Sequence, residues 1–353
     1  MAKASKVENK PGDKTRKAKR KSVKIVGEPA KAGRTGADKK PEGKTIAAEP
    51  KGFGLRLMDD IQNEGVVHQE VVARIEALTN RNLVSYSSFF AHPAGIIDDH
   101  DPRMIETLLQ SIDLSRYPGT LDLMINSPGG IPTAAEKIVL TCREYADSFR
   151  VVVPQTAMSA ATMIAMGADA ILMTATSELG PIDPQMIQTL PNGQQIMRPA
   201  KSFIDAYVDL VNQTQEAVRN KQPHHPFVEL LRTVDPPWIQ ECLKARELAK
   251  KIVIDFLSRW MLRDIGVENV KEVVDRFIAV GEEGSHGRAI RSEKAKSFGL
   301  EQVELIETGG NLWKAIWELH ERSHRYVQSR SLAKYLVGRN GGINVQAKVM
   351  QIS

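Results

Sequence analysis

Two stretches decide the fold: LDLMINSPGGIPTAAEKI, residues 121–138, and VVVPQTAMSAATMIAMGADAILM, residues 151–173. In each, a run of β-prone residues ends in a turn of small residues, and a helical pattern follows. The first turn contains Gly129 and Gly130, and the second contains Ser159. Strands that alternate with helices in this way predict an α/β fold of βαβ units, with a mainly parallel sheet and right-handed crossovers.

The two turns carry the residue types that acyl transfer needs. A glycine turn exposes main-chain N–H groups to an oxyanion, and a serine at a strand-to-helix corner offers a hydroxyl beside further N–H groups. The pattern therefore predicts an enzyme. The competing interpretation is structural, because a plain turn that needs positive φ also selects glycine, and a tight helix start also selects a small residue such as Ser159.

The alternation of elements continues on both sides of these stretches. Strands are expected at 83–89, 121–125, 149–153 and 170–173, and helices at 66–78, 103–112, 133–145 and 160–166. Beyond residue 183 the pattern is helical, with helices expected at 201–221, 238–264, 289–298 and 311–323 and an edge strand after Gly299.

Charge divides the chain into a basic tail and a mildly acidic body. Residues 1–51 carry 16 Lys and Arg against 6 Asp and Glu, a net charge of +10, and since the whole chain is +5 the remainder is −5. The tail has too few apolar residues to offset its ordering entropy, so it is predicted to be disordered. Its basic run at 15–21 is either a contact for acidic partners or a solvated extension. Residues 52–330 are predicted to form one domain, and residues 331–353 a loosely ordered polar end.

The two cysteines give no sign of a metal site or a disulfide framework. Cys142 and Cys242 lie outside any CxxC or Cys/His cluster, which favours a reducing compartment and no metal. No apolar segment follows the basic N-terminus, as a secretory signal requires. The low-charge run 151–168 is broken by polar residues and is a poor membrane span. We therefore predict no transmembrane segment, a cytoplasmic location and no cofactor.

An acidic loop precedes the second expected helix. It contains Asp98, Asp99, His100 and Asp101, a set that could hold a cation. The spacing lacks the glycine of an EF-hand loop, and an Asp-Pro pair commonly begins a helix. An acidic turn is therefore the preferred interpretation.

Five motifs in order resemble a known group of proteins. They are INSPGG, the turn that contains Ser159, GADAILM, SELGPIDPQ and IRSEKAKSFGL, and the resemblance covers about Leu83 to Val303. Together they resemble the ClpP/crotonase superfamily, and within it the serine dehydrogenase proteinases, which are relatives of signal peptide peptidase A and the NfeD-type proteases. The resemblance implies a ClpP/crotonase-like fold with additional C-terminal helices, a serine peptidase-like hydrolase, a peptide or protein substrate, and homo-oligomers formed through the late helices.

The resemblance also assigns roles to the two turns. Ser159 falls on the position of the nucleophile, and Gly129 and Gly130 fall on the oxyanion turn. The N–H of Ala160, which follows the nucleophile, would share the oxyanion with the glycine turn. Loss of one such donor typically lowers the rate by about 10²–10³.

The general base departs from the pattern of the family. ClpP-like proteases place a histidine about two dozen residues after the serine, but residues 160–185 contain neither His nor Lys. Enzymes similar to signal peptide peptidase A use a lysine farther downstream, which implies Lys201, although a second register places Asp209 there. The other candidate is His286, which precedes the IRSEKAKSFGL motif and needs no large pKa shift to accept a proton near neutral pH.

The motif SELGPIDPQ lines the active cleft in related folds. The resemblance therefore implies that Gly180, Pro181, Ile182 and Asp183 present a rigid edge to an extended substrate.

Three interpretations of function remain. The preferred one is peptide hydrolysis through acylated Ser159. A catalytically silent scaffold is the alternative, because the expected histidine is missing. A crotonase-like acyl-CoA enzyme is a third, but it has no use for a serine in the nucleophile turn. Serine dehydrogenase chemistry is disfavoured, since no cofactor lysine with a phosphate-binding glycine loop is found.

Overall fold

The computed structural model describes residues 63–189, 193, 195–279 and 289–347. All of them belong to one compact unit, residues 52–353. The predicted basic tail, residues 1–51, and the candidate base His286 lie outside the described residues.

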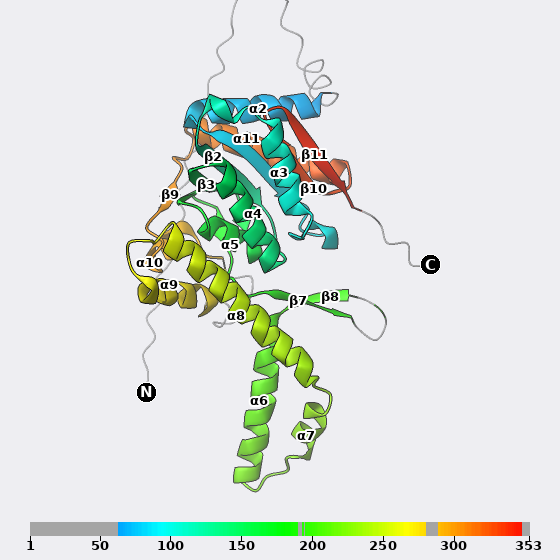
Figure 1. Ribbon diagram of the computed structural model, residues 1–353. Helices are drawn as coiled ribbons and strands as arrows, with labels where there is room; N and C mark the ends of the chain where they lie inside the picture. Colours follow the sequence, from blue (N-terminus) through cyan, green and yellow to red (C-terminus); the bar gives the residue numbers. More distant parts are fainter. Residues whose placement is uncertain (1–62, 190–192, 194, 280–288, 348–353) are drawn as a thin grey trace, which may run out of the picture. The chain divides into compact units, whose positions relative to one another are not determined.

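A seven-stranded sheet forms the centre of this unit (Figure 1). Its strands lie in the order β11-β10-β1-β2-β3-β5-β9, and the five from β1 to β9 are parallel. The strands are β1 (Asn82–Ser88), β2 (Thr120–Asn126), β3 (Ser148–Val153), β5 (Ala170–Met173), β9 (Val303–Leu305), β10 (Leu332–Gly338) and β11 (Gly341–Gln346). The mainly parallel α/β architecture confirms the fold class predicted from the alternation of strands and helices.

Helices cover both faces of the sheet, so its central strands are apolar on both sides. Along β2, Leu121, Leu123 and Ile125 face one hydrophobic cluster, and Met124 faces the other. The first cluster includes residues of α3 (Asp101–Ser111), α4 (Pro132–Tyr145), α5 (Ala160–Met166), α8 (Pro236–Arg259), α9 (Val267–Ala279) and α10 (Ser292–Ser297). The second includes residues of α2 (Glu64–Thr79) and α11 (Asn311–Ser329), which lie side by side in Figure 1.

Short elements connect the sheet to the segment that follows it. A two-residue parallel pair, β4 (Thr156–Ala157) and β6 (Glu178–Leu179), joins the serine turn to the SELGPIDPQ segment. After it come the hairpin β7 (Gln185–Thr189) and β8 (Gln195–Pro199), then α6 (Ala200–Arg219) and α7 (His225–Leu231). The hairpin corrects the prediction from the sequence, in which a helical pattern was expected directly after residue 183. The remaining short elements are the 3₁₀ turns η1 (Pro93–Gly95) and η2 (Leu114–Arg116). Among the described helices, none is both long enough and apolar enough to span a bilayer.

The C-terminal segment also differs from its prediction. Residues 331–353 were expected to be loosely ordered, but β10 lies beside β1 in antiparallel register and is buried along its whole length. The cause is the segment from Leu332 to Val337, which is apolar except for Lys334 and whose side chains alternate between the two faces of the sheet. β11 pairs with β10 through a tight turn and forms one edge of the sheet.

Candidate active site

Ser159 occupies a strained strand-to-helix corner. It lies between β4 and α5 with φ of 50° and ψ of −116°, a combination that costs a residue with a side chain of the order of 1–3 kcal/mol. The residue is buried, with 7% of its surface exposed. The same kind of turn raises the nucleophilic serine of α/β-hydrolases above the end of its sheet.

Gly129 lies directly against this corner. A β-carbon at Gly129 would lie 2.7 Å from Ser159 Cβ, 2.4 Å from Met158 O and 3.0 Å from the main-chain nitrogen of Ala160. Its φ of 93° also favours glycine. The two turns are joined by a main-chain hydrogen bond, because Met158 N–H donates to Ser127 O at 3.0 Å. The structure therefore brings together the glycine turn and the serine turn.

Of the three main-chain N–H groups expected to bind an oxyanion, two make no hydrogen bond in the described part of the chain. Gly129 N–H donates to Ser127 Oγ at 3.2 Å and is engaged within the turn. The N–H groups of Gly130 and Ala160 have no acceptor among the residues that the structure describes. Ala160 N–H is one of the unsatisfied donors that every helix has in its first turn. This pair is suited to bind a developing negative charge.

Asp183 connects Ser159 to two other elements. Its main-chain oxygen accepts the hydroxyl hydrogen bond of Ser159 at 3.3 Å. Its carboxylate is buried, accepts the main-chain N–H of Lys201 at 3.3 Å, and lies 3.2 Å from Arg246 Nε on α8. Burial raises the pKa of the Cys242 thiol, and the negative charge of Asp183 adds to that rise.

Arg246 is a site residue that sequence reasoning missed. On α8 it lies four residues after Cys242 and three before Ala249, both of them buried. A charged residue on the apolar stripe of a helix needs a buried partner of opposite charge. A charged residue within the apolar stripe was the sequence feature that could have revealed this site residue, and its partner is Asp183.

Lys201 lies near the site through its main chain, but its ammonium is directed elsewhere. The ammonium forms an ion pair with Asp205, one turn farther along α6. The alternative residue Asp209 lies two turns along the same helix and is exposed. Within the described part of the chain, no lysine or histidine side chain donates to or accepts from the hydroxyl of Ser159. Because His286 lies outside that part, the identity of the base stays a prediction.

The four residues expected to bind substrate are buried inside this chain. Gly180, Pro181, Ile182 and Asp183 all lie under other elements, and Gly180 N–H donates to Ala157 O at 3.0 Å. Of the four, Asp183 contacts Ser159 directly, and a contact of any of them with substrate stays a prediction.

The acidic segment at the start of α3 contacts a lysine. Asp98 and Asp101 both bind the ammonium of Lys334, which is buried at 1% exposure. No group of His, Cys, Asp or Glu suited to a metal ion occurs in the described ranges.

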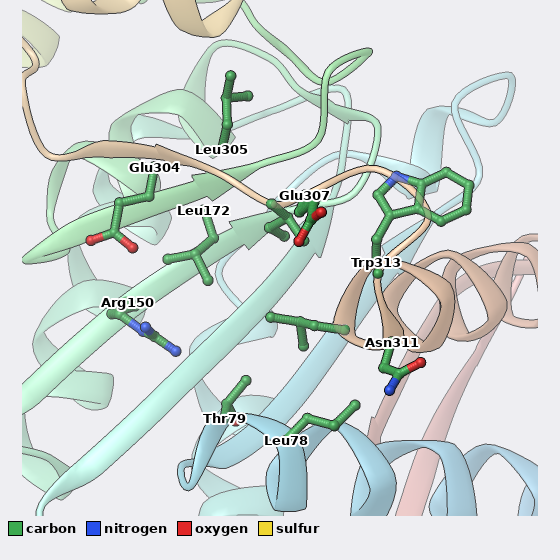
Figure 2. A pocket seen from close by; sticks show the side chains of 12 residues that line it. Leu78, Thr79, Arg150, Leu172, Glu304, Leu305, Glu307, Asn311 and Trp313 are labelled. Atoms are coloured by element: carbon green, nitrogen blue, oxygen red, sulfur yellow. The ribbon is translucent and has the colours of Figure 1, made fainter.

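A cavity of about 440 Å³ lies apart from these residues. It is lined by the end of α2, strands β3, β5 and β9, and the start of α11, and Figure 2 shows Arg150, Leu172 and Glu304 along its sheet side. Leu172 belongs to the cluster on the α2 and α11 face, and none of the site residues lines this cavity.

Comparison with known proteins identifies a family. The model of the ClpP-like SDH-type serine proteinases matches residues 96–273, which include both turns, Asp183, Lys201 and Arg246. Two uncharacterized proteins of Methanocaldococcus jannaschii are similar in sequence. MJ1495 is 32% identical over 46% of this chain and 56% of its own length, and MJ0137 is 40% identical over 65% of this chain and 68% of its own length. The chain thus spans little more than half of one of these relatives and about two thirds of the other.

Proposed function

The chain belongs to the family of ClpP-like SDH-type serine proteinases, and from this premise we propose that it hydrolyses peptide bonds through an acyl-enzyme on Ser159. The observation that carries the proposal is the strained backbone of Ser159 against Gly129, where a β-carbon would overlap Ser159 Cβ at 2.7 Å. Strain of this kind persists only where the surrounding structure enforces it, and it is concentrated at functional sites.

The reaction follows from the geometry in two steps. Ser159 Oγ attacks the peptide carbonyl while a base removes its proton, and the N–H groups of Gly130 and Ala160 bind the resulting oxyanion. Collapse of the intermediate breaks the C–N bond, and the amine leaves with the proton that the base had taken. Water then adds to the ester by the same route, which releases the carboxylic acid and restores Ser159.

The base in this proposal is Lys201 or His286. For Lys201 the position is favourable, because its main-chain N–H binds the Asp183 carboxylate while the carbonyl of Asp183 binds Ser159. To accept a proton, its amine has to leave Asp205 and turn toward Ser159. For His286 the support is its chemistry, because an imidazole accepts a proton near neutral pH without a large pKa shift.

Self-association is part of the proposal. The segment α6–α8 exposes several large apolar side chains, which is common at interfaces between subunits. They are Tyr207, Val208, Val218, Leu230, Leu243 and Leu248. The proposal is thus a homo-oligomer that acts on peptide or protein substrates in the cytoplasm.

Labelling with a fluorophosphonate probe tests the nucleophile. Covalent attachment to Ser159 is expected in the full chain and is expected to disappear in Ser159→Ala. The matched control is Ser331→Ala, because Ser331 is also a serine with positive φ, 51°, and lies before β10. Equal labelling of Ser159→Ala would refute the assignment, and a folded wild type that never reacts favours the silent scaffold.

A further inference from the structure

The oxyanion turn is attached to the loop before α3 through main-chain hydrogen bonds. Ile97 N–H donates to Gly129 O at 2.8 Å, and Ile131 N–H donates to Ile97 O at 2.9 Å. Ile97 and Gly130 are thereby paired as in a parallel bridge, and the N–H of Gly130 points away from Ile97. A β-carbon at Gly130 would lie 2.2 Å from Ile97 O, so the approach requires glycine. Where Ile97 lies therefore determines where the Gly130 N–H is directed.

The next residue in the chain, Asp98, binds a buried lysine. Lys334 Nζ lies 2.8 Å from Asp98 Oδ2, and 3.0 and 2.8 Å from the two carboxylate oxygens of Asp101. Asp101 also accepts the Asp98 N–H at 2.7 Å and the Tyr86 hydroxyl at 3.1 Å. Both Lys334 and Asp101 are at most 1% exposed. We call Tyr86, Asp98, Asp101 and Lys334 the lysine cluster.

Because Lys334 and Asp101 of the lysine cluster are buried, their ion pair is costly to break. An unpaired ammonium or carboxylate in the protein interior is far more costly than one in water, so the loop has to stay closed on Lys334. The ammonium lies within hydrogen-bond distance of three carboxylate oxygens, one of Asp98 and two of Asp101. Because Asp98 directly follows Ile97, the lysine also restricts the main chain that is bonded to the glycine turn.

We propose that Lys334 is a positioning residue for the oxyanion turn: from strand β10 it holds Asp98 and Asp101, and through Ile97 it orients the N–H of Gly130. This inference rests on the proposed function, in which that N–H binds the oxyanion. A lysine cluster that only joined β10 to α3 would affect stability and leave the turn unchanged.

The test compares Lys334→Met, which keeps most of the side-chain stem, with Arg150→Met. Arg150 forms an ion pair with a different buried carboxylate, that of Asp122. The control therefore removes one guanidinium from Asp122, whose second partner, Arg81, remains. Two quantities are measured in each folded variant: the second-order rate of fluorophosphonate labelling at Ser159, and amide hydrogen exchange at Ile97 and Ile131.

Lys334→Met is expected to label about 10²–10³-fold more slowly, the usual effect of losing an oxyanion donor. Exchange at the amides of Ile97 and Ile131 is expected to rise at least about tenfold, as it does when a protecting hydrogen bond opens locally. Arg150→Met is expected to stay within about threefold of the wild type in both measurements, as for a site with no shared partners. Wild-type labelling and exchange in folded Lys334→Met would overturn the inference.

If Lys334→Met does not fold, Asp98→Asn is the second variant in the same experiment. The Asp98 side chain is partly exposed, so its loss of charge is better tolerated, while Asp101 still binds the lysine. Slower labelling and faster exchange at the same two amides support the inference, and no change in either overturns it. If the wild type does not react with the probe at all, the proposed function fails, and the exchange measurements still decide whether Lys334 holds the turn.

Discussion

The hydroxyl of Ser159 donates a hydrogen bond to the main-chain oxygen of Asp183 at 3.3 Å. A carbonyl oxygen orients a hydroxyl but does not accept its proton at neutral pH. The same aspartate is bound to Arg246 through its carboxylate. The direction of the serine side chain therefore depends on an ion pair with α8, a helix that begins only at Pro236.

Replacing Arg246 with methionine should displace Asp183. The buried carboxylate would lose its guanidinium, and since Arg246 is partly exposed we expect a loss of about 1–3 kcal/mol in unfolding free energy, less than for a fully buried pair. Labelling of Ser159 should slow as well. Chemical denaturation and probe kinetics measure the two effects. The control is Arg259→Met on the same helix, which should hardly change stability, because both Arg259 and its partner Asp255 are exposed and such pairs contribute little.

Alanine at Gly129 should abolish labelling. The new methyl group would meet Met158 O at 2.4 Å and Ser159 Cβ at 2.7 Å, so the nucleophile or the turn has to move. Gly309→Ala is a matched control, because Gly309 has a similar φ of 83° and no atom within 4 Å of its β-carbon position. The control should lose only the stability that the added backbone strain costs, of the order of 1–2 kcal/mol, and keep its reactivity. Equal reactivity of the two variants would show that the close approach is irrelevant to the chemistry.

The two candidate bases differ in their pH dependence. A histidine base predicts activity that falls as the pH drops through about 6–7, and loss of activity in His286→Ala. A lysine base predicts that Lys201→Arg is inactive, because a guanidinium stays protonated. Turnover of a peptide ester across pH distinguishes them. Near-normal turnover in both variants would exclude both residues and direct attention to a group from a second subunit.

Two buried histidines should make the protein less stable in acid. Burial lowers the pKa of His68 and of His320 to about 4. Unfolding returns each pKa to about 6.5, so the stability that comes from keeping them neutral is complete above pH 6.5 and is lost as the pH falls toward 4. Each shift corresponds to about 3 kcal/mol at most. Denaturation midpoints from pH 7 to 4.5 measure the loss, and the slope should be smaller in His320→Gln. An unchanged slope in that variant would assign the acid sensitivity to other groups.

Deletion of residues 1–51 should leave folding and hydrolysis intact. The segment holds few apolar residues and a net charge of +10, so it has little to contribute to a core. Melting temperature and turnover of the shortened chain are compared with those of the full chain. A decrease of more than about 4 °C, roughly 1–2 kcal/mol for a domain of this size, would mean that the tail packs on the body.

Much of the fold and the centre of the site follow from local sequence. The β-prone segment 121–125 is long enough for one strand and is followed by a turn that contains two glycines, and the small-residue turn places Ser159 before a helix. These are short-range patterns, in which the period of the apolar residues and the turn residues determine the element. They predicted the parallel strands and the α4 and α5 helices. A shared role for Gly129 and Ser159 was implied by the resemblance to the family, and the structure brings the two residues together where neighbouring parallel strands end.

The sequence by itself determined the central parallel strands, the helices between them, the two turns and the family, since each of these is encoded within short segments of the chain. Only the tertiary structure decided which distant side chains support those turns. β10 was missed because its partner β1 lies near the opposite end of the domain sequence, and the pairs Asp183–Arg246 and Asp98–Lys334 also join segments that are far apart in the chain. Whether a charged side chain stays in water or enters the core depends on whether folding brings it a partner of opposite charge, and that depends on the packing of the whole domain.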